Sequence, residues 1–295
     1  MVINLSLSMP ADVLEAMNAI ERERNCSLVD YGETYSIRIN SVGERLEYYV
    51  KDALSGSFYR DAASRDTAYR KNYAWLGNQN NPPDAIARGG DAFEIKKLQS
   101  SRNDIALNSS PPKDFLHRDD KRIVEACRNS DGSNWAKKDI FYVIGWLQEF
   151  QIRSIYFVQG SCYAASSDVY KKISSRLSKH VSSAILSSGL EAGETDELGR
   201  INKVDPLGIT SLRVRGMWQI KNPSKVFSGV AALDPEMQFQ AFAIMKWEKY
   251  QQLLGNSRQT PFLSENSIKS KKALIPDPNN PAQEIEAAVL EVSWQ

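Results

Sequence analysis

Two carboxylates and a lysine lie close together in the stretch NNPPDAIARGGDAFEIKKL, which runs from Asn80 to Leu98. They are Asp84, Glu94 and Lys96. Paired carboxylate oxygens suit Mg²⁺, which keeps several waters for chemistry. A lysine beside that ion can orient or deprotonate a water, or stabilise charge on a phosphate. The pattern predicts phosphodiester hydrolysis, with Asp84 and Glu94 as metal ligands. The alternative is that Asp84 caps a turn while Glu94 and Lys96 are solvated strand residues.

The turn between the two acids decides whether they meet. DAIA and DAFEIKKL are typical of two strands, and side chains alternate along a strand, so Glu94 and Lys96 share one face while Phe93 and Ile95 occupy the other. A two-residue loop at residues 89–90 would place Asp84 opposite Ile95. A three-residue loop at 88–90 would place it opposite Glu94. We predict the three-residue loop, with Gly90 as its left-handed residue.

A helix ahead of this hairpin offers another acid. SVGERLEYYVKDALSG has helical apolar spacing, Ser41 can cap its start and Gly56 can end it. Glu47 borders the apolar stripe of this helix, whereas Glu44 lies nearer its solvated side. If a helix carboxylate joins the site, we expect it to be Glu47.

Composition excludes several other classes. The chain has 295 residues, 42% of them hydrophobic and 25% charged, which is ordinary for a globular protein. Only two histidines and three scattered cysteines are present, so paired-histidine hydrolases, zinc knuckles and disulfide frameworks are not expected. Nothing resembles a signal peptide, and no apolar run approaches the length of a membrane span. These features predict a cytoplasmic protein that does not enter a membrane.

Net charge is only +1, but basic residues gather locally. Between residues 199 and 227 there are six basic residues against one acid, Asp205. Within that region SLRVRGMWQI is typical of one strand carrying Arg213 and Arg215 on one face, and Lys221 and Asn222 follow it. Because Arg and Lys are the usual readers of guanine in the major groove, we predict DNA contact by these four residues. The alternative is a solvated strand face.

The order of elements predicts an α/β fold with a central mixed β-sheet flanked by helices. Helices are expected in 10–25, 41–56, 120–128 and 167–189, and strands in 138–148, 152–164, 211–220 and 239–247. NYAWLGNQNNPP is expected to be a loop, and Asp91 a turn residue. IPDPNNPAQEIEAAV has helical spacing and is expected to be a loop leading into a terminal helix. Residues 1–262 would form a single domain and residues 263–295 a C-terminal extension.

At this point the residues resemble a known family. Pro83-Asp84 with Glu94-Ile95-Lys96 resembles the PD-(D/E)XK nuclease motif. Six segments resemble type II restriction endonucleases of the NgoPII type: GNQNNPPD, GDAFEIKK, ALNSSPP, VEACRN, VDPLGIT and RVRGMW. The resemblance runs from about Gly43 to Phe227. The resemblance implies a restriction-endonuclease-like core with Asp84, Glu94, Lys96 and Glu47 as catalytic residues. It also implies Mg²⁺-dependent cleavage of double-stranded DNA by a homodimer at a short palindrome, GGCC in the family's named member. A cognate DNA methyltransferase would be a functional partner.

Two alternatives remain open on the sequence. One is a repair or recombination nuclease with the same core, which would cut by DNA structure rather than by sequence. The other is a non-catalytic DNA-binding protein with a vestigial metal site. The presence of Asp84, Glu94 and Lys96 together argues against the second.

Overall fold

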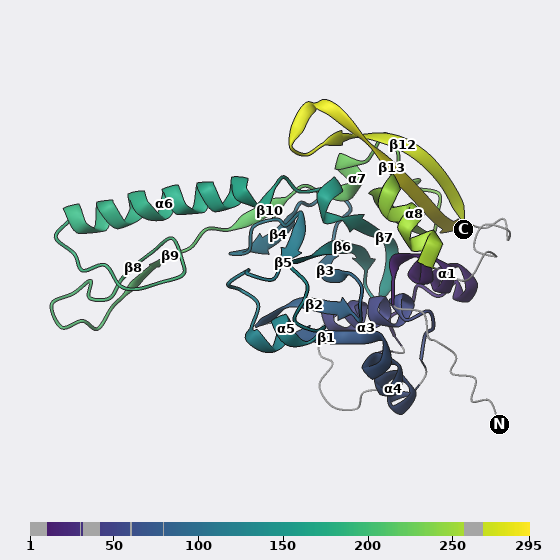
Figure 1. Cartoon of the computed structure of the whole chain (residues 1–295), viewed down its shortest axis with the longest axis horizontal. Coiled ribbons are helices and arrows are strands. Elements are labelled where there is room, and N and C mark those ends of the chain that lie inside the picture. Colours follow the sequence, from purple (N-terminus) through teal and green to yellow (C-terminus); the bar gives the residue numbers. More distant parts are fainter. Residues whose placement is uncertain (1–10, 30, 32–41, 60, 79, 257–267) are drawn as a thin grey trace.

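The computed structural model (Figure 1) describes the chain except residues 1–10, 30, 32–41, 60, 79 and 257–267. Its helices are α1 (Val13–Glu23), α3 (Val42–Leu54), α4 (Ala62–Asn72), α5 (Glu125–Asn129), α6 (Ser167–Ser187), α7 (Pro223–Val226) and α8 (Trp247–Asn256), with a 3-10 turn, η1, at Gly160–Cys162. None of the helices in this described part is long and apolar enough to cross a bilayer. Helix α1 begins after Asp12, whose carboxylate accepts a hydrogen bond from the amide of Glu15 and so caps the helix.

The strands form one large mixed sheet and two small ones. They are β1 (Tyr73–Asn78), β2 (Asn81–Ala87), β3 (Ala92–Leu98), β4 (Ile105–Asn108), β5 (Phe115–His117), β6 (Lys137–Gln148), β7 (Gln151–Gln159), β8 (Gly199–Ile201), β9 (Leu212–Val214), β10 (Trp218–Ile220), β11 (Phe239–Lys246), β12 (Lys269–Asp277) and β13 (Asn280–Trp294). In the described residues the large sheet has the order β1-β2-β3-β6-β7-β11-β13-β12, and β5 pairs with β6. Strands β3 and β6 are parallel, as are β7 and β11. The predicted mixed sheet is confirmed.

Apolar side chains cover both faces of this sheet. On one face α1 and α3 pack over Phe93, Ile95 and Phe141 in a single buried cluster. On the other face β4, β10 and Phe227, which follows α7, pack over Tyr142 and Ile144. Since a strand alternates its side chains, Glu94 and Lys96 are directed away from the α3 face, as the sequence predicted.

A long arm extends from this body (Figure 1). It consists of α6 and the β8–β9 ribbon, which lie side by side at one end of the molecule. Along α6 only Ile185 is buried, so the arm has little core of its own. The ribbon packs on α6 at Gly199, where a side-chain Cβ would come within 2.4 Å of Val181. The opposite face of the ribbon therefore faces away from α6.

Four expectations about elements were wrong. Tyr73–Asn78, expected to be a loop, forms β1 because it pairs with β2. The terminal segment forms the β12–β13 hairpin rather than a helix, since β13 pairs with β12 and its second half, Ala287–Trp294, also pairs with β11. The single strand expected over 211–220 is broken into β9 and β10, which belong to different sheets. In 120–128 a helix was expected, and only the short α5 forms. The predicted cap Ser41 lies outside the described residues, and the division at residue 262 stays a prediction.

Candidate active site and DNA interface

The hairpin between β2 and β3 has the predicted three-residue loop. Ala85 lies opposite Phe93 and Ile86 opposite Ala92, a register that places Asp84 opposite Glu94. The amide of Ala87 donates to the carbonyl of Asp91 (2.9 Å), which closes the loop over residues 88–90. The left-handed residue is Gly89, with φ of 67°, and not Gly90 as expected. A left-handed backbone is least costly at glycine, which explains a glycine at position 89.

The three predicted residues meet in one cluster. The Nζ atom of Lys96 lies 2.6 Å from Oε1 of Glu94 and 4.0 Å from Oδ2 of Asp84. Oδ2 of Asp84 also accepts a hydrogen bond of 2.6 Å from the backbone amide of Ile95, between the two other residues. The side chains keep 15% (Asp84), 20% (Glu94) and 27% (Lys96) of their surface exposed. The cluster is partly sheltered and still open to a ligand.

The electrostatics of the cluster favour a bound cation. Burial, together with the neighbouring carboxylates of Glu94 and Glu47, raises the pKa of Asp84 to about 7, although Lys96 acts in the opposite direction. Burial disfavours the charged form of Lys96, but Glu94 and Asp84 outweigh it and raise the pKa of its ammonium group. Lys96 is therefore charged at neutral pH, which suits charge stabilisation or water orientation better than proton abstraction.

Helix α3 brings Glu47 to the same place. It packs closely on β6 because Gly145 has no side chain there: a Cβ would lie 2.8 Å from Leu46. Glu47 is half-buried, and its Oε2 atom lies 3.2 Å from Nζ of Lys51, a buried lysine one turn later. Glu47 is close enough to act on the pKa of both Asp84 and Lys96. The structure thus brings all four predicted catalytic residues together.

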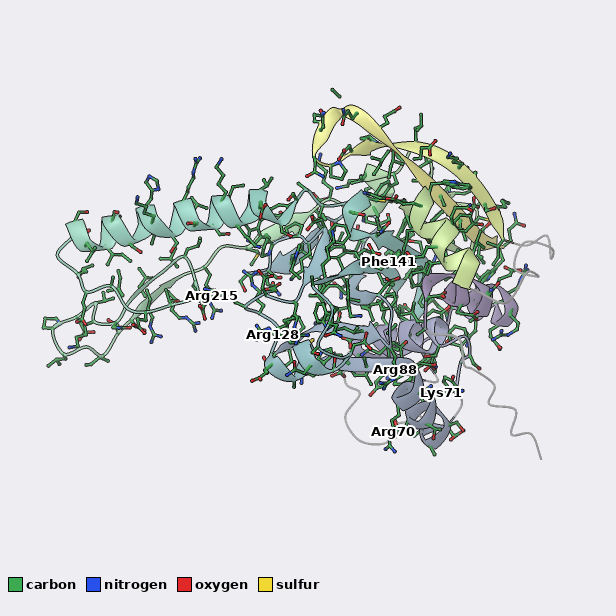
Figure 2. All side chains as sticks on the ribbon, in the orientation of Figure 1. Arg70, Lys71, Arg88, Arg128, Phe141 and Arg215 are labelled. Carbon is green, nitrogen blue, oxygen red and sulfur yellow. The ribbon has the colours of Figure 1, made fainter. Side chains whose placement is uncertain are left out.

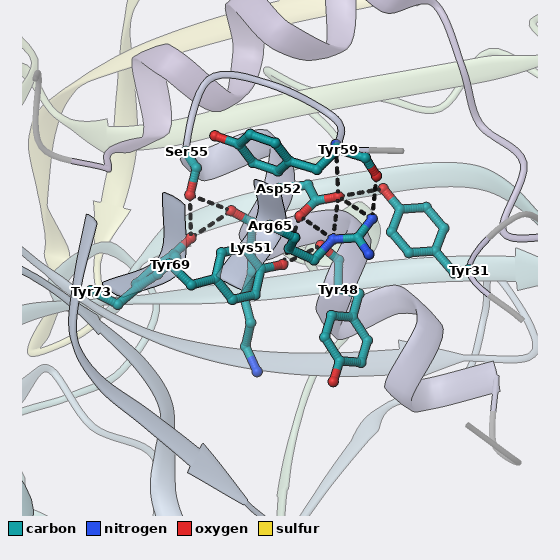
Figure 3. A network of polar contacts seen from close by, with 9 residues as sticks. All are labelled: Tyr31, Tyr48, Lys51, Asp52, Ser55, Tyr59, Arg65, Tyr69 and Tyr73. Carbon is teal, nitrogen blue, oxygen red and sulfur yellow. Dashed lines mark hydrogen bonds and ion pairs between the residues drawn. The ribbon is translucent and has the colours of Figure 1, made fainter. Parts of the chain in front are cut away.

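A buried ion pair fixes α3 in this position (Figure 3). The carboxylate of Asp52, fully buried, accepts hydrogen bonds from Nε and Nη2 of Arg65 at 2.9 Å each. It also accepts hydrogen bonds from the hydroxyls of Tyr31 and Tyr69 and from the amide of Tyr59. Both carboxylate oxygens of Asp52 therefore accept hydrogen bonds, as a buried charge requires. The network joins α3 to α4 five residues beyond Glu47 along the helix.

The donors at this site fit a hard divalent cation. Asp84 and Glu94 supply carboxylate oxygens, the ligand type that Mg²⁺ prefers, and Mg²⁺ is commonly held by one or two carboxylates plus waters and phosphate. Burial first, and the carboxylate of Glu94 second, raise the pKa of Asp84, so ionising Asp84 beside Glu94 carries an electrostatic cost. A cation between them would offset this cost. Across the described residues, no three His, Cys, Asp or Glu side chains form a ready-made metal site.

The predicted DNA-contact residues lie in two places. Arg213, in β9, and Arg215, just after it, are more than half exposed on the arm, where Figure 2 labels Arg215. Lys221 is exposed at the root of the arm and lines a surface cleft with Asp104, Lys225 and Val226. Asn222 is buried: its amide donates to the carbonyls of Ser101 and Asn103, and its oxygen caps α7.

Sequence reasoning missed one polar cluster beside the site. The ammonium group of Lys249, in α8, lies 2.6 Å from Asp91 and 3.0 Å from Asp139, and both Lys249 and Asp91 are buried. Asp91, expected to be a turn residue, directly follows the turn at 88–90, and its side chain forms a buried ion pair. Its partner is 158 positions away in the chain, so no local pattern could have indicated the pair.

Comparison with known proteins finds one family and one relative that match most of the chain. The sequence model of the family described as NgoPII restriction endonuclease matches residues 11–276. The chain is also 38% identical over 247 residues to the type II restriction enzyme NgoPII of Neisseria gonorrhoeae, which covers 83% of this chain and 87% of that protein. No solved structure matches the chain.

Proposed function

Because the chain belongs to the family of NgoPII restriction endonucleases, we propose that Asp84, Glu94, Lys96 and Glu47 are the residues with which this type II restriction endonuclease hydrolyses DNA. The observation that carries the proposal is the meeting of Asp84, Glu94 and Lys96 across one hairpin. Three residues of these types, partly sheltered and close together, are a sufficient set for hydrolysis of a phosphodiester.

Each side chain has a separate part in the proposed mechanism. Asp84 and Glu94 would hold Mg²⁺, which supplies Lewis-acid stabilisation of the phosphate and a more acidic water. The backbone amide of Ile95 keeps Asp84 turned toward Glu94. Lys96 stays protonated and would orient the attacking water or stabilise the charge that develops on the phosphate. Glu47 adds negative charge at the edge of the cluster, where it would favour the cation.

The β8–β9 ribbon supports major-groove recognition by the arm. A two-stranded ribbon is one of the shapes that the major groove admits, and arginine is the commonest reader of guanine there. Arg213 and Arg215 are exposed on this ribbon, and Lys221 lies at its root. Since the side chain of Asn222 is bonded inside the protein, we assign Asn222 to positioning this segment rather than to reading bases.

A short palindrome, with GGCC as the candidate sequence, is the proposed target. A palindromic site is matched by a two-fold dimer, since the symmetry of the protein and of its site must agree. We therefore propose that the active form is a homodimer and that the host DNA is protected by a methyltransferase of the same specificity.

A digestion experiment tests the proposal. Unmethylated plasmid would be incubated with the purified protein and Mg²⁺, and the new DNA ends would be sequenced. Lys96→Ala and EDTA should each abolish cleavage, whereas Lys97→Ala, which removes the adjacent exposed lysine, should leave it. Lys96→Ala should still bind DNA.

The ends distinguish the candidate functions. Discrete fragments that share one palindromic end would support the proposal and identify the site. Cutting only at junctions or at random would favour a structure-specific nuclease. Intact plasmid with DNA still bound would favour a non-catalytic DNA-binding protein.

A further inference from the structure

One acid on the arm binds both of the arginines assigned to DNA. Glu197 accepts hydrogen bonds from Nε (2.9 Å) and Nη2 (2.7 Å) of Arg213. Its Oε1 atom also accepts one from Nε of Arg215 at 2.5 Å. The Glu197 side chain is 15% exposed, against 53% for Arg213 and 59% for Arg215. The acid thus lies beneath the two arginines, which cover it on the solvent side.

The backbone around Glu197 is fixed. Its amide donates to Oγ1 of Thr195 at 3.0 Å, and the amide of the next residue, Leu198, donates to the carbonyl of Val214 at 3.1 Å. These bonds hold Glu197 at the start of β8, beside the end of β9. The carboxylate is therefore presented to the arginines from a defined place and not from a loose chain.

The positive charge on this face of the β8–β9 ribbon exceeds the negative charge of Glu197. Arg200 lies directly opposite Arg213 in the β8–β9 register, and like charges in that relation destabilise a strand pair. Glu197 bonds Arg213 and Arg215, and Arg200 has no ion pair with an acid in the described chain. A face with this charge is suited to binding an anionic partner. The Glu197 carboxylate would determine how the arginines contact that partner.

The contacts leave a defined donor edge exposed. Arg213 uses Nε and Nη2, whereas Arg215 uses only Nε. Within the described residues the two terminal nitrogens of Arg215 have no hydrogen-bond acceptor. Two parallel N–H groups are what guanine O6 and N7 accept. Glu197 thus holds the Arg215 guanidinium group by its Nε atom and directs the two terminal nitrogens outward.

We propose that Glu197 is a specificity-determining positioning residue of the DNA interface, which aligns Arg213 and Arg215 for guanine and keeps them from binding phosphates. The inference rests on the proposed function, because it assumes that these arginines contact DNA. A fixed carboxylate holds the arginines in the geometry of base contact and repels the phosphate backbone. It therefore increases the difference in affinity between the recognition site and other sequences. Freed arginines would instead bind phosphates of any sequence.

The test compares Glu197→Gln with the wild-type enzyme on two duplexes. One holds the site mapped by plasmid digestion, and the other has a single G·C pair of that site replaced by A·T. Glutamine keeps the size of the side chain but loses its charge and one acceptor. We expect the ratio of kcat/KM for the two duplexes to fall about tenfold, within the range for one bidentate base contact. The kcat on the mapped site should stay within about twofold.

Non-specific binding gives a second readout. On a duplex that lacks the site, Glu197→Gln should bind more tightly at low salt. Its plot of log affinity against log salt should be steeper by about 1, because one more phosphate is neutralised. Glu194→Gln, which removes an exposed acid from the same loop, makes the same change in charge and should leave the cleavage ratio unchanged.

The outcomes separate the two proposals. If wild-type enzyme cuts one site and Glu197→Gln keeps its discrimination, the inference about Glu197 is wrong while the proposed function stands. If the variant loses stability and slows equally on both duplexes, Glu197 is structural and the inference is again wrong. If wild-type enzyme neither binds nor cuts DNA, the proposed function fails and the inference fails with it.

Discussion

Replacing Arg65 by Met should be among the most damaging single changes outside the site, because it leaves Asp52 charged and fully buried without its cation. Removing one partner of a buried ion pair costs about 3–5 kcal/mol. The three other donors to Asp52, two tyrosine hydroxyls and a backbone amide, are neutral and offset only part of the loss. We expect the free energy of unfolding to fall by roughly 3 kcal/mol or more at pH 8.

The loss should depend on pH in a predictable direction. Burial raises the pKa of Asp52 even with Arg65 present, and the pKa should rise further when the arginine is gone. Asp52 can then become neutral at moderately acid pH, so the difference in stability between Arg65→Met and wild type should shrink from pH 8 to pH 5. Asp52→Asn added to Arg65→Met removes the orphaned charge and should restore much of the stability at pH 8.

Urea unfolding followed by fluorescence measures these differences. Arg70→Met, which changes an exposed arginine of the same helix, is the matched control and should lie within about 0.5 kcal/mol of wild type. The reasoning is refuted if Arg65→Met costs no more than Arg70→Met, or if its cost is the same at pH 5 and pH 8.

Three further predictions follow from single residues. Burial and the neighbouring carboxylates raise the pKa of Asp84 to about 7, and a bound cation requires the ionised form of this carboxylate. Mg²⁺ binding measured by calorimetry should therefore weaken up to about tenfold per pH unit below 7. Equal affinity at pH 7 and pH 6 would contradict this prediction. Burial raises the pKa of Asp12 to about 7, so the folded state loses stability as pH rises from about 4 to 7. Asp12→Asn keeps the helix cap and should therefore raise Tm more at pH 8 than at pH 5; equal Tm changes at the two pH values would be against it. Gly145→Ala places a Cβ 2.8 Å from Leu46, so α3 must shift. The free energy of unfolding should fall by about 1–3 kcal/mol, and cleavage should slow. Full activity and stability would show that Leu46 moves aside without displacing α3.

The candidate site was predictable where local chemistry decides the structure. The alternation of Phe93 and Ile95 against Glu94 and Lys96, together with the length of the turn, was enough to place Asp84 opposite Glu94. The position of the left-handed glycine was assigned incorrectly, and the buried ion pair of Asp91 was missed. The apolar stripe of α3 likewise brought Glu47 into electrostatic contact with the cluster.

The errors arose where distant pairing decides the structure. The terminal segment has helical apolar spacing, yet β12 pairs with β13 and β11 offers a strand edge to Ala287–Trp294, and this pairing overrides the local preference. β1 contains Gly77 and Asn78 and becomes a strand because β2 lies beside it. The hydrogen bonds from Arg213 and Arg215 to Glu197 also come from the folding of a ribbon across an irregular loop, which apolar periodicity does not report.

The sheet order has a consequence for how the chain completes its fold. Strand β11 is buried along nearly its whole length, and among the described strands β13 is the one that pairs with its second edge, opposite β7. β13 also contacts α1, the first described helix. Helix α1 and strand β13 therefore meet in the same core, and β11 keeps an open apolar strand edge until β13 has paired with it. Such an edge pairs readily with other chains. Loss of the last fifteen residues, which end in Trp294 and Gln295, would consequently lead to aggregation rather than to a shortened nuclease.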